Sequence, residues 1–327
     1  YTPIRFGWDG RLPVPGDGTY DWHGMIPISA MPHMVDPEDG WYGTANHNNV
    51  PPHYPNVFAD FYADPARSWR LDEVLSSSAG HTIEDSMRLQ YDNKSMTAEL
   101  LVSVLLSLEP LEGLEASWEL LDAWDYVMDR DSGAALIYDK WELAMLAALN
   151  HQVMPDQDEL ITRIKLREWM SEPPVHMFGE DPEKARDALM IESFQSAVSM
   201  LREAFGTDVS QWAYGEVHVS HIEHPLSHLV GDDFDAAPLP RGGASNTLNA
   251  NHGDSVQLAG GTFRIVVDTA DWDKAVATNS PGQSGDPRSP FYKNVYKDWN
   301  QGNYFPLLYS REKIEQKAAE RLLLKPR

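Results

Sequence analysis

Hydrophobic residues from Thr82 onward recur with the three- and four-residue spacing of an amphipathic helix. In IEDSMRLQYDNKSMTAELLVSVLLSL, Met87, Leu101 and Leu105 follow this spacing, which places their side chains on one side of a helix. Thr82 and Asp85 stand three positions apart, as the two members of an N-terminal capping pair do. The pattern predicts one long helix over this segment.

Four further segments repeat the helical pattern, and helix-breaking residues separate them. The segments cover residues 114–130, 134–151, 156–170 and 182–205. The breaks fall at Pro110, Gly113, residues 131–133, Pro155 and Pro173. Proline lacks the backbone N–H that a helix needs, and glycine has a low helix propensity. The middle of the chain is therefore predicted to form five successive helices.

The chain on either side of this helical part has a different pattern. Residues 1–65 read as loops with short extended pieces, because proline and glycine punctuate them densely from Asp9 to Pro55. Aromatic side chains are expected to hold these loops: Trp8, Trp22, Trp41, Tyr42, Phe58 and Phe61. After Gly206, YGEVHVSHI and TFRIVVDT have the alternating or β-branched residues of strands. The amphipathic REKIEQKAAERLLL predicts a closing helix.

No internal repeat or low-complexity linker divides the sequence, so a single region is predicted over residues 1–327. It comprises a loop and strand segment (1–80), a helical segment (81–206), and a strand-rich segment with a C-terminal helix (207–327). With 42% hydrophobic and 10% aromatic residues, the chain can bury a large core.

Charge and cysteine content exclude several functions. The chain has 50 acidic and 26 basic residues, for a formal charge of −24, whereas nucleic acids and anionic membranes bind clustered Lys and Arg. Neither is predicted as a partner. The absence of cysteine excludes disulfides, a thiol nucleophile and thiolate metal sites. No apolar run approaches the ~20 residues of a membrane span, and the opening YTPIRFGWDG, which lacks signal-peptide features, resembles the interior of a longer protein.

Ten short motifs along the chain resemble, in order, the β-chain of the penicillin acylase family. They are DGRLPVPG, DWHGMIPISAMP, GTANHNNVPPHYP, LQYDNKSMTAELLVSVLL, WAYGEVHVSHIEHPL, GGASNTLN, GGTFRIVVDTADWD, PGQSGDPRSPFY, DWNQGNYFPLLYSREKI and LLLKP. Members of this family are N-terminal nucleophile hydrolases that cleave amides. The resemblance implies an α+β fold, part of a four-layer αββα sandwich with a peripheral helical region.

The resemblance also implies a mechanism and two site residues. In the family, the hydroxyl of an N-terminal Ser attacks the amide carbonyl with its own α-amino group as base, and fixed donors hold the oxyanion. Tyr1 cannot replace this Ser, so the nucleophile is expected upstream. The family's amide motif falls on GTANHNNVP and implies Asn48 as an oxyanion donor. Its active-site arginine falls on Arg67, with Arg70 as the fallback because two residues are deleted just before it.

On this interpretation the chain is the C-terminal part of an acylase β-chain and is inactive by itself. Its implied partners are the acylase α-chain and the upstream β-chain segment. Its substrate would be a small N-acyl amide: a β-lactam side chain, an acyl-homoserine lactone or a lipopeptide acyl chain. The alternative is a non-catalytic, acidic binding or scaffold protein on the same fold. Because the family is typically periplasmic or secreted, that location is expected here.

Both site residues also have ordinary structural explanations. An asparagine in a loop rich in proline often accepts a backbone hydrogen bond in an Asx turn. Arg67 lies near Asp60, Asp64 and Asp72 in the sequence, so a surface ion pair worth about 0–1 kcal/mol is the default expectation.

Two metal hypotheses arise from the sequence. His218, His221 and His224 in HVSHIEH are a possible zinc set, but this spacing suits neither one face of a strand nor one face of a helix. Structural roles are favoured, and a metallohydrolase stays an alternative. No cofactor is expected for catalysis. The family often carries a structural calcium, for which DPEDG and the Gly10 carbonyl offer oxygen ligands, while other ligands would lie upstream.

Overall fold

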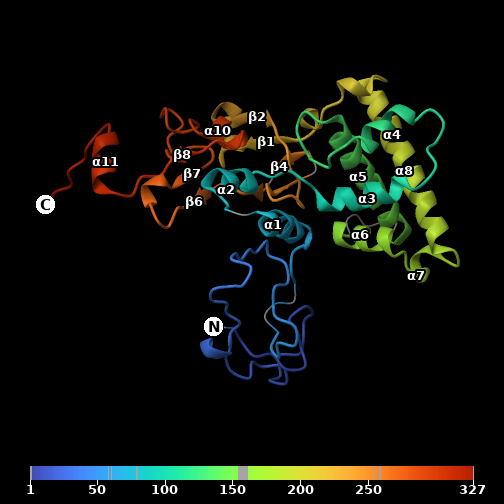
Figure 1. Cartoon of the computed structure of the whole chain (residues 1–327), viewed down its shortest axis with the longest axis horizontal. Coiled ribbons are helices and arrows are strands. Elements are labelled where there is room, and N and C mark those ends of the chain that lie inside the picture. The colour runs from blue at the N-terminus through green and yellow to red at the C-terminus, as the bar shows by residue number, and fades with distance from the viewer. Residues whose placement is uncertain are drawn as a thin grey trace. The chain divides into compact units, whose positions relative to one another are not determined.

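A computed structural model describes residues 2–57, 59, 61–78, 80–153, 161–253, 255–257 and 259–326. The chain forms two compact units, Tyr1–Ser78 and Ala79–Arg327, which are described separately (Figure 1). Several positions used in the sequence analysis lie outside the described residues: Tyr1, Phe58, Asp60, Pro155 and residues 156–160 of the fourth predicted helix.

The first unit consists mostly of loops, as its proline and glycine content predicts. Its described residues form a 3-10 turn, η1 (Ile28–Ala30), and one helix, α1 (Ala66–Ser77). The prediction of only loops and strands before residue 80 is wrong, because α1 forms there. It forms because its sequence contains neither proline nor glycine, and because the Asp64 carboxylate accepts a hydrogen bond from the Ala66 N–H at its start (2.8 Å).

The second unit contains the helical core. Its first seven helices are α2 (Ile83–Gln90), α3 (Met96–Leu106), α4 (Glu115–Asp122), α5 (Gly133–Val153), α6 (Arg163–Ser171), α7 (Val175–Phe178) and α8 (Pro182–Phe205). Helices α5 and α8 pack side by side (Figure 1). Trp141 of α5 is fully buried between them and donates a hydrogen bond to the Met190 carbonyl of α8 (3.0 Å). The prediction at 182–205 is confirmed to the residue, and that at 134–151 within two residues at its end.

The predicted long helix after Thr82 is wrong, because the chain forms two helices there. Thr82 and Asp85 do form the predicted capping box at the start of α2. The helix then ends, the Asp92 side chain accepts the Lys94 N–H (2.9 Å), and Ser95 caps α3. Aspartate and serine favour such local hydrogen bonds over a continuous helix, and the apolar spacing on both sides concealed the break.

Three other predicted helices are shorter than expected. In the described part of the segment 156–170, residues 161 and 162 are not helical, and α6 begins only at Arg163. The segment 114–130 is helical only through Asp122, after which Tyr126 adopts a positive φ of 63° and the chain turns. The C-terminal helix α11 (Arg311–Lys317) ends seven residues before Leu324.

The described residues of the strand-rich part of the second unit form three small sheets. Its strands are β1 (Val219–Ile222), β2 (Ala236–Pro240), β3 (Asn251–His252), β4 (Val256–Gln257), β5 (Ala259–Gly260), β6 (Arg264–Val266), β7 (Val276–Thr278) and β8 (Phe305–Pro306). The sheet orders are β2-β1-β4, β3-β5 and β6-β7-β8. Two short helices lie between strands of the same sheet: α9 (Ser227–Val230) follows β1 and precedes β2, and α10 (Tyr296–Asn300) follows β7 and precedes β8. The mixture of helices and sheets confirms the predicted α+β class.

Two buried arginines hold this part together. Arg241 and Arg264 each donate to the Asn249 side-chain oxygen, at 2.8 and 2.7 Å. The Arg241 guanidinium also lies over the Trp299 ring, 4.4 Å from its centre, where a cation is attracted to the ring face. Burial lowers the pKa of Arg241 to about 10, so the side chain is still charged at neutral pH.

Among the described residues, no helix combines the length and the apolar composition that crossing a bilayer requires.

Candidate functional site

The candidate site in the first unit is the asparagine-rich loop after Gly43, which α1 holds in place. Arg67, in the first turn of α1, donates from Nη2 to the Ala45 carbonyl (2.8 Å) and to Asn46 Oδ1 (3.1 Å). Asn46 has a positive φ of 65°, a conformation that asparagine tolerates better than most residues do. One guanidinium thus fixes both the backbone and a side chain of the loop.

Asn48 lies two residues beyond this contact and is exposed. Its side-chain oxygen accepts the Val50 N–H at 3.2 Å, which is the predicted Asx turn. Within the described residues its NH2 group has no hydrogen-bond partner, whereas the neighbouring Asn49 donates to the Tyr42 hydroxyl. Asn48 therefore has a fixed carbonyl end and a free donor end. A free amide donor can bind an oxygen that gains negative charge.

Arg67 differs from an ordinary surface arginine. It is half-buried, and burial lowers its pKa, while the negative charge of Asp64 has the opposite, smaller effect. Within the described part of the chain it forms no ion pair with Asp64 or Asp72, so the default surface ion pair is not observed there; Asp60 lies outside that part. Arg70 instead forms an ion pair with Glu73 (2.8 Å). The structure brings Arg67, not Arg70, to the asparagine loop.

The link between Arg67 and Asn46 was not anticipated from the sequence. The two residues lie 21 positions apart, and no local pattern connects them. Asn46 also has a free NH2 group, since its described side-chain contact is through oxygen. A carbonyl oxygen that accepts from a guanidinium polarises the amide and strengthens its N–H donors. Asn46 is therefore a second candidate donor beside Asn48.

The three histidines of the zinc hypothesis have separate surroundings. His218 is buried, stacks on Tyr214 at 4.6 Å, and hydrogen-bonds through Nδ1 with the Arg241 carbonyl (2.8 Å). Burial lowers its pKa. His221 lies 3.9 Å from Asp235, and His224 packs against an aromatic ring. Searching the described residues reveals no group of three His, Asp or Glu side chains that could hold a metal, in HVSHIEH or in DPEDG.

Comparisons with known proteins show which families and enzymes this chain resembles. The family model for penicillin amidase matches residues 1–316. The acyl-homoserine lactone acylase QuiP of Pseudomonas aeruginosa is 25% identical over 96% of this chain and 43% of its own length. The penicillin acylase 2 proenzyme of Pseudomonas sp. is 29% identical over 97% of this chain and 43% of its length. The chain thus spans less than half of these relatives.

A solved structure has a similar fold. A thermostable penicillin G acylase from Alcaligenes faecalis aligns with a TM-score of 0.64 and 17% sequence identity, covering all of this chain and 65% of that chain. This likeness supports the predicted fold of the penicillin acylase type.

Proposed function

Because the chain belongs to the penicillin amidase family, we propose that it is the C-terminal part of the β-chain of an amidohydrolase that cleaves N-acyl amides. Relatives along its whole length are named as acyl-homoserine lactone and penicillin acylases. Two observations carry the proposal. Arg67 holds the asparagine loop through Ala45 and Asn46, and Asn48, whose side-chain oxygen accepts the Val50 N–H, has an NH2 group without a partner among the described residues.

In the proposed mechanism, an upstream Ser hydroxyl attacks the amide carbonyl carbon and transfers its proton to its own α-amino group. The carbonyl oxygen gains negative charge, and the Asn48 N–H donates to it. The tetrahedral intermediate then collapses, the C–N bond breaks, and the proton passes to the leaving amine. Arg67 acts as a positioning residue, because it holds the loop through Ala45 and Asn46 rather than touching the substrate.

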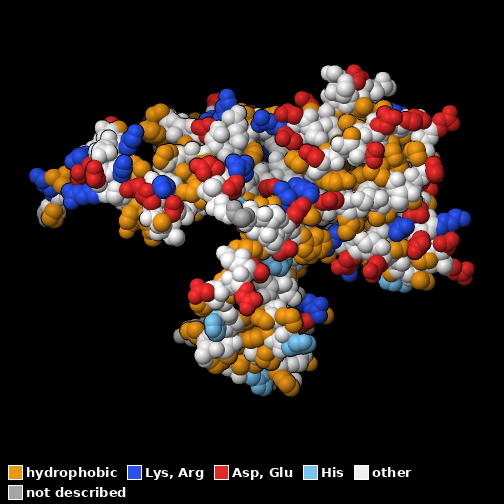
Figure 2. Space-filling view, in the orientation of Figure 1, with side chains coloured by type: hydrophobic (Ala, Val, Ile, Leu, Met, Phe, Trp, Pro, Cys, Tyr) orange, Lys and Arg blue, Asp and Glu red, His pale blue; other side chains and the backbone are white. Residues whose placement is uncertain are grey.

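We further propose that the rest of a longer precursor, the upstream β-chain segment and the α-chain, packs against the first unit. Large hydrophobic side chains there are exposed: Phe6 (74%), Ile28 (80%) and Phe61 (75%). Figure 2 shows hydrophobic side chains across much of the visible face of this unit. A loop-rich unit with so few buried apolar residues gains little stability from its own core. The periplasmic or secreted location and the structural calcium stay predictions from the family resemblance.

The test expresses the complete precursor and assays penicillins and N-acyl-homoserine lactones of several chain lengths. We expect hydrolysis of at least one class, and a loss of about a hundredfold or more in turnover for Asn48→Ala, the usual cost of removing an oxyanion donor. Asn49→Ala is the matched control, because its NH2 group already binds Tyr42.

Asn46→Ala in the same assay separates the two candidate donors. Wild-type turnover of Asn48→Ala combined with a large loss in Asn46→Ala would transfer the donor role to Asn46. If the precursor has no N-terminal nucleophile and hydrolyses none of these substrates, the scaffold protein is favoured instead.

A further inference from the structure

The first unit contains an aromatic pocket that the proposed acylase mechanism does not use. It lies within the segment 8–22 and has a volume of about 500 Å³. Pockets that hold drug-sized ligands measure roughly 300–1,000 Å³, so this one has room for more than a single small ion. Its walls are three aromatic rings, one carboxylate and a short aliphatic stretch: Trp8, Tyr20, Trp22, Asp21, Val14 and Pro15.

Backbone hydrogen bonds bring the two ends of this segment together. The Ile4 N–H donates to the Gly24 carbonyl, and the His23 N–H donates to the Ile4 carbonyl, both at 3.0 Å. The residues between these bonds therefore form a closed loop, with Trp8 near its start and Trp22 at its end. This closure explains how residues from both ends of the loop line one pocket.

Contacts inside the loop fix the aromatic wall. The Trp8 indole N–H donates to the Leu12 carbonyl (2.8 Å), which sets the orientation of the ring. The Asp17 carboxylate accepts the Thr19 N–H (3.0 Å) in a turn just before Tyr20. A wall that is already ordered loses little conformational freedom when a ligand binds, and this favours affinity.

The polar groups of the pocket are free to bind a ligand. In the described part of the chain, the Asp21 carboxylate, the Tyr20 hydroxyl and the Trp22 indole N–H form no hydrogen bond or ion pair. The carboxylate accepts hydrogen bonds, the indole donates one, and the hydroxyl can do both. The Trp22 side chain is also 59% exposed, so a ligand can reach its ring.

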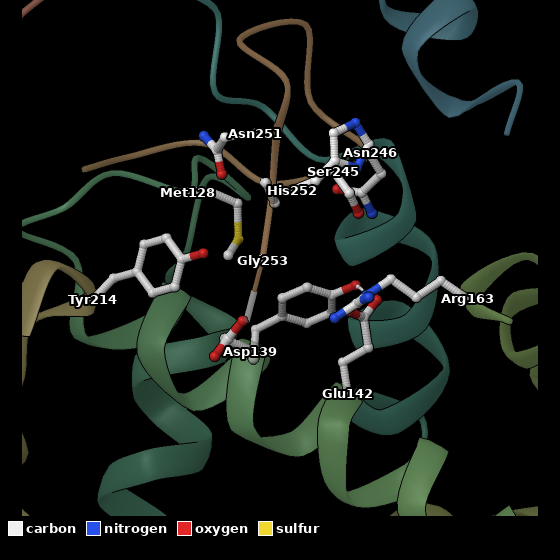
Figure 3. Close-up of a pocket in the computed structure, with 12 residues that line it drawn as sticks. Met128, Asp139, Glu142, Arg163, Tyr214, Ser245, Asn246, Asn251, His252 and Gly253 are labelled. Carbon is white, nitrogen blue, oxygen red and sulfur yellow. Dashed lines mark hydrogen bonds and ion pairs between the residues drawn. The ribbon is translucent and has the colours of Figure 1, made fainter. Parts of the chain in front are cut away.

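The pocket of the second unit differs in this respect. It lies between α5 and the segment 244–253, and Figure 3 shows Glu142 and Arg163 meeting at one end of it. These two side chains form an ion pair (2.7 Å), and Asp139 pairs with Lys140 (2.9 Å). Because these charged groups are already paired, that pocket is a weaker candidate for a ligand site than the aromatic pocket is.

The combination of ring faces and free polar groups limits the class of ligand. Aromatic rings pack against apolar C–H surface, but a purely apolar ligand would leave the Asp21 carboxylate without a hydrogen bond, which is costly where water is excluded. An anion would be repelled by Asp21 and by the formal charge of −24. A quaternary ammonium ion is attracted to aromatic rings, but it cannot accept the Trp22 N–H.

We propose that this pocket binds a neutral saccharide of about disaccharide size. Its ring C–H faces pack on Trp8 and Trp22, and its hydroxyl groups donate to Asp21 and accept from the indole N–H. A ligand of this length, unlike a small ion, contacts opposite walls of the pocket at once. The upstream segments are proposed to cover other side chains of this unit, none of which lines the pocket: Phe6, Ile28 and Phe61.

The test is calorimetric titration of the complete protein with cellobiose, maltose, sorbitol and choline chloride. At least one of the two disaccharides should bind, because linked sugar rings present C–H faces together with hydroxyl groups. Sorbitol has hydroxyl groups without a ring, and choline is a cation, so neither should bind measurably. Binding of neither disaccharide, equal affinity for a disaccharide and sorbitol, or binding of choline alone would each overturn the proposal.

Trp22→Ala should weaken binding of the disaccharide by at least about tenfold, because tryptophans that contact a ligand often contribute this much. Asp21→Asn should also weaken it, since charge-assisted hydrogen bonds become neutral ones. Trp272→Ala is the matched control, because Trp272 has a similar exposure (50%) and does not line the pocket.

Unchanged affinity in a folded Trp22→Ala protein would contradict the proposal, and so would an equal loss in Trp272→Ala. The titrations measure binding without any acylase activity. Their outcome is therefore independent of the proposed function.

Discussion

At the scale of single residues, Arg67 shows how context changes the role of a common side chain. A guanidinium with aspartates nearby in sequence is expected to pair with them. Here it donates instead to a backbone carbonyl and an asparagine oxygen. Both acceptors belong to the loop that carries Asn48, so this arginine determines the shape of the loop. Its effect on catalysis would be indirect, through the position of the amide donor.

We predict that Arg67→Ala lowers kcat of the complete enzyme by about ten- to a hundredfold, since small displacements of a catalytic group cost rates of that order. KM should change little, because an oxyanion donor acts mainly in the transition state. Arg67→Lys should recover only part of the loss, as an ammonium lacks the planar fork of donors.

Arg70→Ala is the control for this prediction, because Arg70 forms an ion pair with Glu73 in the described part of the chain. Steady-state kinetics on the same substrate measure all three variants. A larger loss for Arg70→Ala than for Arg67→Ala would restore Arg70 as the site arginine.

At the scale of elements, the α5 and α8 pair is the centre of the second unit. Trp141 has no exposed surface, meets Phe194 edge-on with ring centres 6.2 Å apart, and donates its indole N–H across the helix interface. Helix α5 also carries Asp139 and Glu142, which line a pocket of about 160 Å³ together with Asn246 and Asn251. The packing that fixes this helix therefore also positions one wall of that pocket.

We predict that Trp141→Ala lowers the free energy of unfolding by about 3–5 kcal/mol, through lost burial and the cavity left behind. Met200→Ala on α8, where the side chain is 53% exposed, should change it by less than about 0.5 kcal/mol. Urea unfolding, followed by far-UV circular dichroism, measures both changes in the free energy of unfolding. A loss below about 1 kcal/mol for Trp141→Ala would contradict the assigned core, given the usual cost of such truncations.

At the scale of the whole molecule, the two units differ in how they are stabilised. The second has an extensive buried core, whereas the buried hydrophobic residues of the first are Ile26, Ala45 and Ala66 among those described. The chain also covers only 43% of the length of the relatives QuiP and penicillin acylase 2. Both facts support the proposal that upstream segments pack against the first unit.

We predict that these 327 residues expressed alone show no acylase activity, and that co-expression with the rest of the precursor restores it. Hydrogen exchange should be fast over residues 2–57 in the isolated chain and slower in the complete protein, because new contacts would cover the exposed hydrophobic side chains. Equal exchange in the two preparations would argue against the proposed packing of upstream segments on this unit.

Secondary structure was predictable where local signals agreed. At α8, continuous apolar periodicity coincides with a capping Asp181, Pro182 at the first helical position and Gly206 just past the end. At the break between α2 and α3, periodicity continued while Asp92 and Ser95 redirected the backbone. Helix α1 was not predicted, because the loop prediction, which rests on the dense proline and glycine residues before it, was extended to residue 80.

The sequence alone determined the family, the α+β class, the strongest helices and the residue types of the candidate site, because motifs and periodicity are properties of neighbouring positions. Only the tertiary structure decided that Arg67 contacts Asn46, and that Asp139 and Asn251 face one pocket. Those contacts join segments far apart in the chain, and their geometry depends on how whole elements pack, which no local pattern specifies.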